Sequence, residues 1–152
     1  MNTKLLAKNR KALFDYGIID KYTAGIVLEG HEVKSIREGN VNFEGSYISM
    51  VENEPYVVNL YIGRYSKKSF DTKPFDPKRP RKLLLESKEI NEISRALSEK
   101  GRTAVPLALV LSNNLIKLEI ATVKGMKKYE KKQVAKEKQM EKDLQKEAKT
   151  LI

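Results

Sequence analysis

The chain has 152 residues, with 30 Lys and Arg against 20 Asp and Glu, and a formal net charge of +10 at pH 7. It contains no Cys, no Trp and a single His, which excludes a disulfide framework, Cys-ligated metal sites, thiol catalysis and any site built on two histidines. No apolar run approaches the roughly 20 residues that cross a bilayer. We therefore expect a cytoplasmic protein with one folded domain, an anionic partner and no cofactor.

Residues 1–123 are predicted to form a mainly β domain. Alternating or β-rich apolar patterns predict strands at 22–28, 46–51, 55–62, 81–85, 105–111 and 116–120. Turn-forming residues at 52–54 and 113–114 predict two hairpins. Pro106 has no backbone N–H to donate, so its strand is expected at a sheet edge or with a bulge at that residue.

Two short helices are predicted between the strands. Residues 32–38 carry apolar side chains at helical spacing and stop at Gly39, a glycine suited to a helix C-terminus. Residues 87–100 begin with Ser87 as a candidate N-cap and end at Gly101. Short strands with turn signals and two helices favour a small closed or partly closed barrel. Residues 65–80 contain three prolines and no periodicity, and we expect a mobile basic loop there.

The positive charge lies in three blocks, at residues 1–14, 64–82 and 124–152. Such clusters favour phosphates or anionic lipid as the partner. Aromatic residues are interleaved with the second block, and Phe70 and Phe75 have two open interpretations: they stack on unpaired bases, or they anchor the loop to the domain. Lys34 and Arg37, at i,i+3 on the first helix, are predicted to position phosphates without reading sequence.

The segment 124–152 carries ten Lys and five acids, and is predicted to be a separate basic tail. It has good helix formers, but its charges repeat at i,i+4 as seven like-charge pairs, which oppose a free helix by about 1.5–3.5 kcal/mol in total. Our hypothesis is a tail that is disordered when free and helical on a polyanion. A simply solvated charged helix is the alternative.

The residue types argue against an enzyme. His31 is the only imidazole and has no Cys or Ser partner pattern, and no Gly-rich phosphate loop is present. Carboxylate pairs such as Glu29 with Glu32 lack a supporting metal cluster and lie beside Lys or Arg. We expect neither a catalytic residue nor a metal site.

Several motifs together resemble one protein family. The stretch at 25–47 reads GIVLEGHEVKSIREGNVNFEGSY, and it resembles the signature region of the small protein B family, the SsrA- or tmRNA-binding proteins of bacteria. The resemblance continues in NRKALFDY at 9–16, DPKRPRKLLL at 76–85, VPL at 105–107 and KGMKKYEKK at 124–132. It therefore covers nearly the whole chain in order.

The resemblance implies an oligonucleotide-binding (OB) β-barrel with short flanking helices and the basic tail. It implies a monomeric adaptor that binds the tRNA-like domain of tmRNA and enters the A site of a 70S ribosome stalled on mRNA without a stop codon. The tail would enter the empty mRNA channel as a helix, and the stalled peptide would be tagged for proteolysis. The protein would perform no chemistry and would need no membrane.

Site residues follow from the matching motifs. The resemblance assigns tmRNA binding to Asn9, Arg10, Glu32, Lys34, Ser35, Arg37, Asn40, Arg81, Lys82 and Leu84. It assigns ribosome contacts to the tail residues Gly125, Lys127, Lys128, Tyr129, Lys131 and Lys132, with Gly125 as a hinge.

Three positions in the folded part depart from the family pattern. Thr23 replaces a frequent Glu, Glu86 stands where Asn or His is common, and His31 replaces a frequent Trp. Two alternatives to the adaptor remain open: a ribosome-associated protein that binds rRNA, and a membrane-surface protein held by its Lys-rich tail. The narrow apolar stripe of the tail lacks Trp and Phe and disfavours the membrane alternative.

Overall fold

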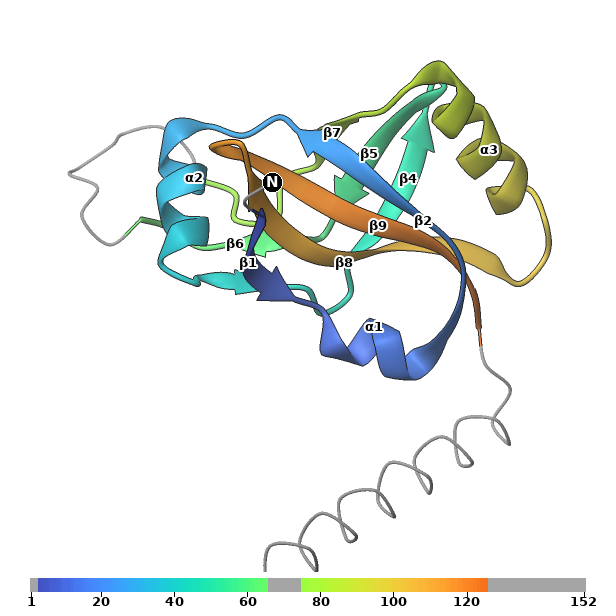
Figure 1. The fold of residues 1–152 in the computed structure, drawn as a ribbon, viewed down its shortest axis with the longest axis horizontal. Coiled ribbons are helices and arrows are strands. Elements are labelled where there is room, and N and C mark those ends of the chain that lie inside the picture. Colours follow the sequence, from blue (N-terminus) through green and yellow to red (C-terminus); the bar gives the residue numbers. More distant parts are fainter. Residues whose placement is uncertain (1–2, 66–74, 126–152) are drawn as a thin grey trace, which may run out of the picture.

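The computed structural model describes residues 3–65 and 75–125, which form a curled β structure with three short helices (Figure 1). In chain order the elements are β1 (Thr3–Lys8), α1 (Arg10–Asp15), β2 (Tyr16–Ile26), α2 (Gly30–Arg37), β3 (Val41–Asn42), β4 (Tyr47–Val51), β5 (Glu54–Val58), β6 (Tyr61–Ile62), β7 (Arg81–Leu84), α3 (Ser87–Leu97), β8 (Arg102–Ser112) and β9 (Leu115–Gly125). No helix in these ranges is long and apolar enough to cross a membrane.

Seven strands form one antiparallel sheet in the order β1-β8-β9-β2-β7-β5-β4, and β3 pairs with β6 in a second, two-stranded sheet. Both predicted hairpins are confirmed. The β4–β5 turn places Glu52 and Asn53 at φ 52° and 64°, and the β8–β9 turn places Asn113 and Asn114 at φ 51° and 64°. Two consecutive residues at positive φ are the geometry that matches the twist of a two-residue hairpin.

The sheet curls without closing. Its edge strands are β1 and β4, and no ladder joins them within the described residues, although β4 approaches β8 across the core. The predicted mainly β class with short helices is therefore confirmed, and the closed barrel is not observed. Of the two alternatives for Pro106, the bulge is confirmed: β8 lies between β1 and β9, and its register with β9 shifts between Pro106 and Ala108.

The core lies inside the curl. Its largest cluster of buried side chains joins the strands to α2 and α3, and includes Ile36, Leu83, Ile93, Leu109 and Leu118. A smaller cluster under α1 contains Ala12, Val105, Leu107, Ala121 and Val123. Each helix thus packs one face on the sheet and leaves the other in solvent.

The helices differ from prediction mainly at their ends. The stop of α2 at Gly39 is confirmed, with φ at 80°. For α3, the N-cap is Glu86 and not Ser87, because Glu86 and Glu89 form a reciprocal capping box. α3 ends at Leu97, three residues before the predicted end, ahead of a turn that reaches Gly101 at φ 80°.

Four features were not predicted, namely β1, α1, β3 and the first half of β2. The single strand predicted at 55–62 is wrong: β5 ends at Val58, Asn59 takes a positive φ of 62°, and β6 pairs with β3 in the second sheet. Most of the predicted loop at 65–80 and the whole of the tail after Gly125 lie outside the described residues.

Candidate nucleic-acid interface

A buried ion cluster fixes α2 to the start of β7. Glu32, on α2, is 1% exposed and Arg81, the first residue of β7, is 0% exposed. The Nε atom of Arg81 donates to Oε2 of Glu32 at 2.6 Å, and Arg79 donates to both carboxylate oxygens. The backbone N–H of Glu29 donates to Oε1 at 2.9 Å. The carboxylate therefore meets two guanidinium groups and one backbone donor.

The hydrogen bonds decide the charge state of this cluster. Burial alone raises the pKa of Glu32, but the bonds from Arg79, the Glu29 N–H and Arg81 outweigh it and hold the pKa below the ordinary value. Burial lowers the pKa of Arg81, and Glu32 opposes that shift. Two further Arg81 donors are satisfied by the backbone, with Nη1 to Leu60 O at 2.6 Å and Nη2 to Pro77 O at 3.1 Å. Arg81 thereby joins α2, the chain before β6 and the chain before β7.

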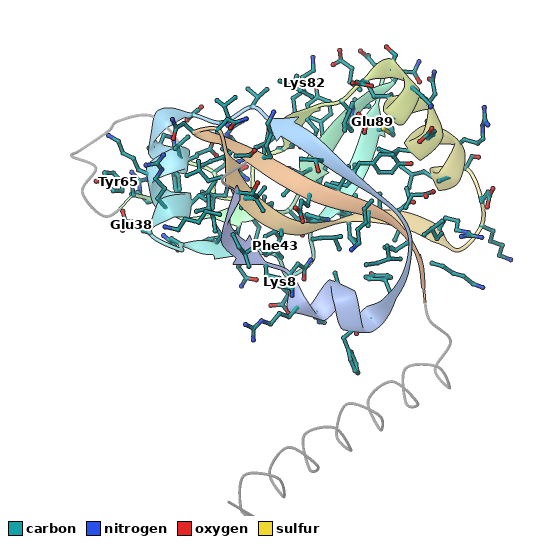
Figure 2. The ribbon with its side chains drawn as sticks, in the orientation of Figure 1. Lys8, Glu38, Phe43, Tyr65, Lys82 and Glu89 are labelled. Carbon is teal, nitrogen blue, oxygen red and sulfur yellow. The ribbon has the colours of Figure 1, made fainter. Side chains whose placement is uncertain are left out.

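The opposite face of α2 presents cations to solvent. Lys34 and Arg37 are exposed, and neither forms an ion pair with a described residue. Lys34 places its Nζ atom 5.4 Å from the ring centroid of Tyr65, which Figure 2 shows beside α2. Ser35, between the two cations, is fully buried and donates to Gly63 O at 2.6 Å. Alternation of buried and exposed residues thus orients α2.

Asn40 and Gly63 secure the end of α2. Asn40 is exposed, its backbone O accepts from the Gly63 N–H at 3.0 Å, and its Nδ2 donates to Arg64 O at 3.4 Å. A Cβ at Gly63 would lie 2.0 Å from that Nδ2 atom, so any larger residue there requires the Asn40 side chain to move.

Phe75 anchors the returning chain beside α2. Its ring meets His31 edge-on, with centroids 5.9 Å apart, and Arg64 lies 4.5 Å from its centroid. His31 also places Nε2 2.5 Å from Oε2 of Glu29. The geometry favours the anchoring interpretation for Phe75, whereas Phe70 lies outside the described residues. His31, one of the predicted departures from the family pattern, takes this packing position.

Lys82 and Leu84 lie on the outer face of β7, away from the core. Lys82 donates from Nζ to Oε1 of Glu54 at 3.2 Å, and Figure 2 labels it at the top of the view. Leu84 is 56% exposed and lies opposite Gly25 of β2. These two residues extend the candidate surface from α2 onto the sheet.

Asn9 and Arg10 belong to a different place, at the start of α1 (Figure 1). Asn9 is the N-cap: its Oδ1 accepts from the Ala12 N–H at 3.2 Å and its Nδ2 donates to Pro106 O at 2.8 Å. Its side chain is thus fully engaged inside the protein, whereas Arg10 is exposed. The predicted site residues therefore separate into buried supports, an exposed α2–β7 surface and the α1 end.

Of the residues predicted to contact the ribosome through the tail, only Gly125 lies within the described part of the chain. Gly125 is exposed, is the last residue of β9 and pairs with Tyr16 of β2, without the positive φ found at three other glycines. Lys127, Lys128, Tyr129, Lys131 and Lys132 lie outside the described residues. Of the two other family departures, Thr23 is exposed on β2 and Glu86 caps α3.

Arg79 is the functional support that sequence reasoning missed. The sequence held one indication of this role. A Glu on the inner face of a basic helix needs cationic neighbours when it is buried, and Arg79 lies two residues before Arg81. Within residues 3–65 and 75–125, no group of three or more His, Asp or Glu side chains could hold a metal ion.

The chain is similar to known SsrA-binding proteins. The family model for SmpB protein matches residues 6–150. The chain is 45% identical over 152 residues to an SsrA-binding protein of Sulfurihydrogenibium sp. (strain YO3AOP1), covering 100% of this chain and 99% of the relative. It is 44% identical over 152 residues to an SsrA-binding protein of Persephonella marina, with the same coverage.

A solved structure is also similar. It is described as "tmRNA-SmpB: a journey to the center of the bacterial ribosome", and it aligns with a TM-score of 0.68 at 39% identity. The alignment covers 81% of this chain and 86% of the other.

Proposed function

Because this chain belongs to the SmpB protein family, we propose that it binds tmRNA through the tRNA-like domain of that RNA and serves as the adaptor of trans-translation. In this role it delivers tmRNA to the A site of a 70S ribosome stalled on an mRNA without a stop codon. The ribosome then resumes on the tmRNA reading frame, and the peptide is tagged. The family is a non-enzymatic RNA-binding one, so the work of the protein is recognition and placement.

The observation that carries this proposal is a helix with a fixed inner face and exposed cations on its outer face. Glu32 is held by Arg79 and Arg81 on the inner side of α2, while Lys34 and Arg37 stand in solvent on the outer side. Cations on a fixed helix contact phosphates at set positions and release condensed counterions. A folded RNA is recognised largely by its shape and backbone, which suits this surface.

Lys82 and Leu84 extend the proposed surface along β7. The Lys82 side chain is 42% exposed and forms an ion pair with Glu54. An RNA phosphate would therefore compete with an exposed carboxylate for the Lys82 ammonium group. Leu84 offers an apolar contact to a sugar or base. The buried residues Glu32, Ser35 and Arg81 act in this proposal by positioning α2 and β7, and Asn9 acts by positioning α1.

We further propose a division between a body, residues 1–123, and a tail, residues 124–152. The body is a partly open relative of the OB barrel and holds tmRNA. The tail enters the empty mRNA channel through the set Lys127, Lys128, Tyr129, Lys131 and Lys132, with Gly125 at its base. A net charge of +5 in 29 residues favours entry into a channel lined by RNA. The protein acts as a monomer in the cytoplasm.

The test of the α2 surface is a double substitution, Lys34→Ala with Arg37→Ala. Both side chains are exposed, so the fold is expected to survive. Affinity for the isolated tRNA-like domain is expected to fall, and the salt slope of log K to decrease by about 0.7–0.9 for each lost phosphate contact. The measurement is fluorescence anisotropy across a salt series.

The matched control is Lys88→Ala with Arg95→Ala on α3. It removes the same charge from exposed positions on another helix. Equal losses in the two variants would mean that only net charge matters, and would contradict a specific α2 surface.

A further inference from the structure

A cleft of about 400 Å³ opens between α1 and the turn that joins β3 to β4. Lys11, Asp15 and Tyr16 line one wall, Glu44 and Tyr47 line the other, and β8 closes the floor with Val105. It is separate from the α2–β7 surface, and apart from Asn9, which supports α1, it holds none of the proposed tmRNA-binding residues.

Internal hydrogen bonds fix both walls of the cleft. The α1 wall is tied to β8 by Asn9, whose N–H donates to Leu107 O at 2.7 Å and whose side chain reaches Pro106 O. On the turn, Gly45 adopts a positive φ of 77° and Ser46 donates from Oγ to Phe43 O at 2.5 Å. The cleft therefore exists before any ligand enters it, which lowers the ordering cost of binding.

The interior of the cleft suits a flat aromatic ligand. Its base is apolar, with Phe43 8%, Ala12 4% and Val105 3% exposed. Tyr16 and Tyr47 add two rings, and Tyr47 is 42% exposed, with ring surface open to a partner. Aromatic side chains in such positions stack on unpaired bases.

Three charged side chains of the cleft have no partner among the described residues. The carboxylates of Asp15 and Glu44 form no hydrogen bond or ion pair with a described residue, and the ammonium group of Lys11 forms none. Two acceptors and one cation therefore face an apolar, aromatic recess. These charged groups suit a neutral ring that has hydrogen-bond donors and a hydrogen-bond acceptor along the same edge.

We propose that this cleft binds an unstacked guanine base of an RNA partner. Guanine is the nucleobase whose Watson–Crick edge presents two adjacent donors, N1–H and the N2 amino group, and these match a carboxylate. Its O6 acceptor, on the same edge, matches Lys11. Adenine, cytosine and uracil lack that pair of adjacent donors. The inference rests on the proposal that the partner is RNA, and it assigns a second contact point away from α2.

The surroundings supply the phosphate contacts that a bound nucleotide requires. Lys8 and Arg10, at the end of β1 and the start of α1, are exposed and unpaired among the described residues, and Figure 2 shows Lys8 beside α1. They offset the repulsion that Asp15 and Glu44 exert on an RNA backbone. Tyr16 pairs with Gly125, so the guanine would lie where the tail leaves the body.

The test compares two nine-nucleotide single-stranded RNAs, uridines with one central guanosine or one central adenosine. The full chain is expected to bind the guanosine RNA at least about fivefold more tightly, which is the lower end of the discrimination given by one good bidentate base contact. Asp15→Asn with Glu44→Gln is expected to bring the ratio close to one. The charge-matched control, Glu52→Gln with Glu119→Gln, changes two carboxylates outside the cleft and is expected to retain the preference.

The site itself can be located by NMR with guanosine monophosphate. Amide shifts are expected at Gly45 and Thr103, which line the cleft, and not at Gly101. Equal binding of the two oligonucleotides by the unaltered chain, or a preference that survives in the cleft variant, would overturn the inference.

Binding to the tRNA-like domain, measured on the same preparations, separates the two proposals. Normal binding to that domain without a guanosine preference overturns the cleft inference alone. Loss of binding to both kinds of RNA in the unaltered chain overturns the proposed function.

Discussion

Replacing Glu32 by Gln removes the central charge of the buried cluster while keeping the shape of the side chain. Arg81 then stays in the core with no carboxylate opposite it. It is 0% exposed at its side chain and 2.6 Å from Glu32 Oε2 in the unaltered protein. The Gln amide also offers donors where Arg79 and Arg81 require acceptors. The substitution therefore isolates a buried charge without creating a cavity.

The expected cost follows from that burial. Removing one partner of a buried pair destabilises proteins by about 3–5 kcal/mol, because the remaining charge is left desolvated and unpaired. A domain of this size is stable by about 5–15 kcal/mol, so Glu32→Gln is expected to remove a large part of the free energy of unfolding. RNA affinity is expected to fall as well, although Glu32 itself is buried, because α2 loses its attachment to β7.

The assay is urea denaturation followed by circular dichroism, with Glu54→Gln as the matched control. Glu54 also pairs with a cation, Lys82 at 3.2 Å, but both side chains are exposed, by 49% and 42%. An exposed pair contributes about 0–1 kcal/mol, so the control is expected to stay near the unaltered protein. Equal stability of the two variants would refute the reasoning that burial makes the Glu32 cluster a structural support.

The same carboxylate gives a pH dependence with a defined sign. The pKa of Glu32 is lowered in the fold from its ordinary value of 4.5, so its contribution to stability is fully present above that value. It is lost as the pH falls through the folded pKa, because the unfolded chain takes up the proton first. The unaltered protein is expected to lose stability below about pH 4.5, and Glu32→Gln to lose less over that window. If the free energies of unfolding of the unaltered protein and of Glu32→Gln fell by the same amount as the pH is lowered, this assignment would be contradicted.

Three further outcomes are expected. Truncation after Lys124 is expected to change the affinity for the tRNA-like domain by no more than about twofold. It is expected to abolish peptide tagging in a reconstituted stalled-ribosome assay. A large loss of RNA affinity would show that the body and the tail share the binding. Burial, helped by the hydrogen bond to Glu92, raises the pKa of Tyr22 to about 12. Tyr22→Phe is therefore expected to remove a phenol that ionises near pH 12 from a spectrophotometric titration. An unchanged titration curve would contradict this assignment. In the unaltered protein the Tyr22 contribution is fully present below about pH 10 and is lost as the pH rises through 12. Gly63→Ala is expected to displace Asn40 and lower the free energy of unfolding by about 1 kcal/mol in urea, whereas no change would mean that Asn40 rotates without cost.

The hairpins and the interior strands were predictable because their signals are local. Both β8 and β9 are predictable from the sequence alone, because apolar residues alternate in each strand and the Asn113–Asn114 turn lies between them. β1 and the first half of β2 gave no such signal, since much of their stability comes from ladders with β8 and β9, far along the chain. Sheet closure was likewise unpredictable from local patterns, because it depends on whether edge strands β1 and β4 meet.

The candidate site was predictable in part for the same reason. Spacing on α2 placed Lys34 and Arg37 together and facing outward, as the structure has them. The burial of Glu32, Ser35 and Arg81 could not be predicted from local patterns, because their partners are distant in the sequence. Arg79 and Arg81 lie 47 and 49 residues after Glu32, and Gly63 lies 28 residues after Ser35. Motif matching identified these residues without separating those that support the surface from those that form it.

The most direct measurement of the central claim is recovery of the full chain from bacterial cells, followed by sequencing of the RNA that remains bound at moderate salt. The account predicts strong enrichment of one small structured RNA, tmRNA, and its loss from the Lys34→Ala, Arg37→Ala variant. Recovery of bulk rRNA alone, or of no RNA, would contradict it.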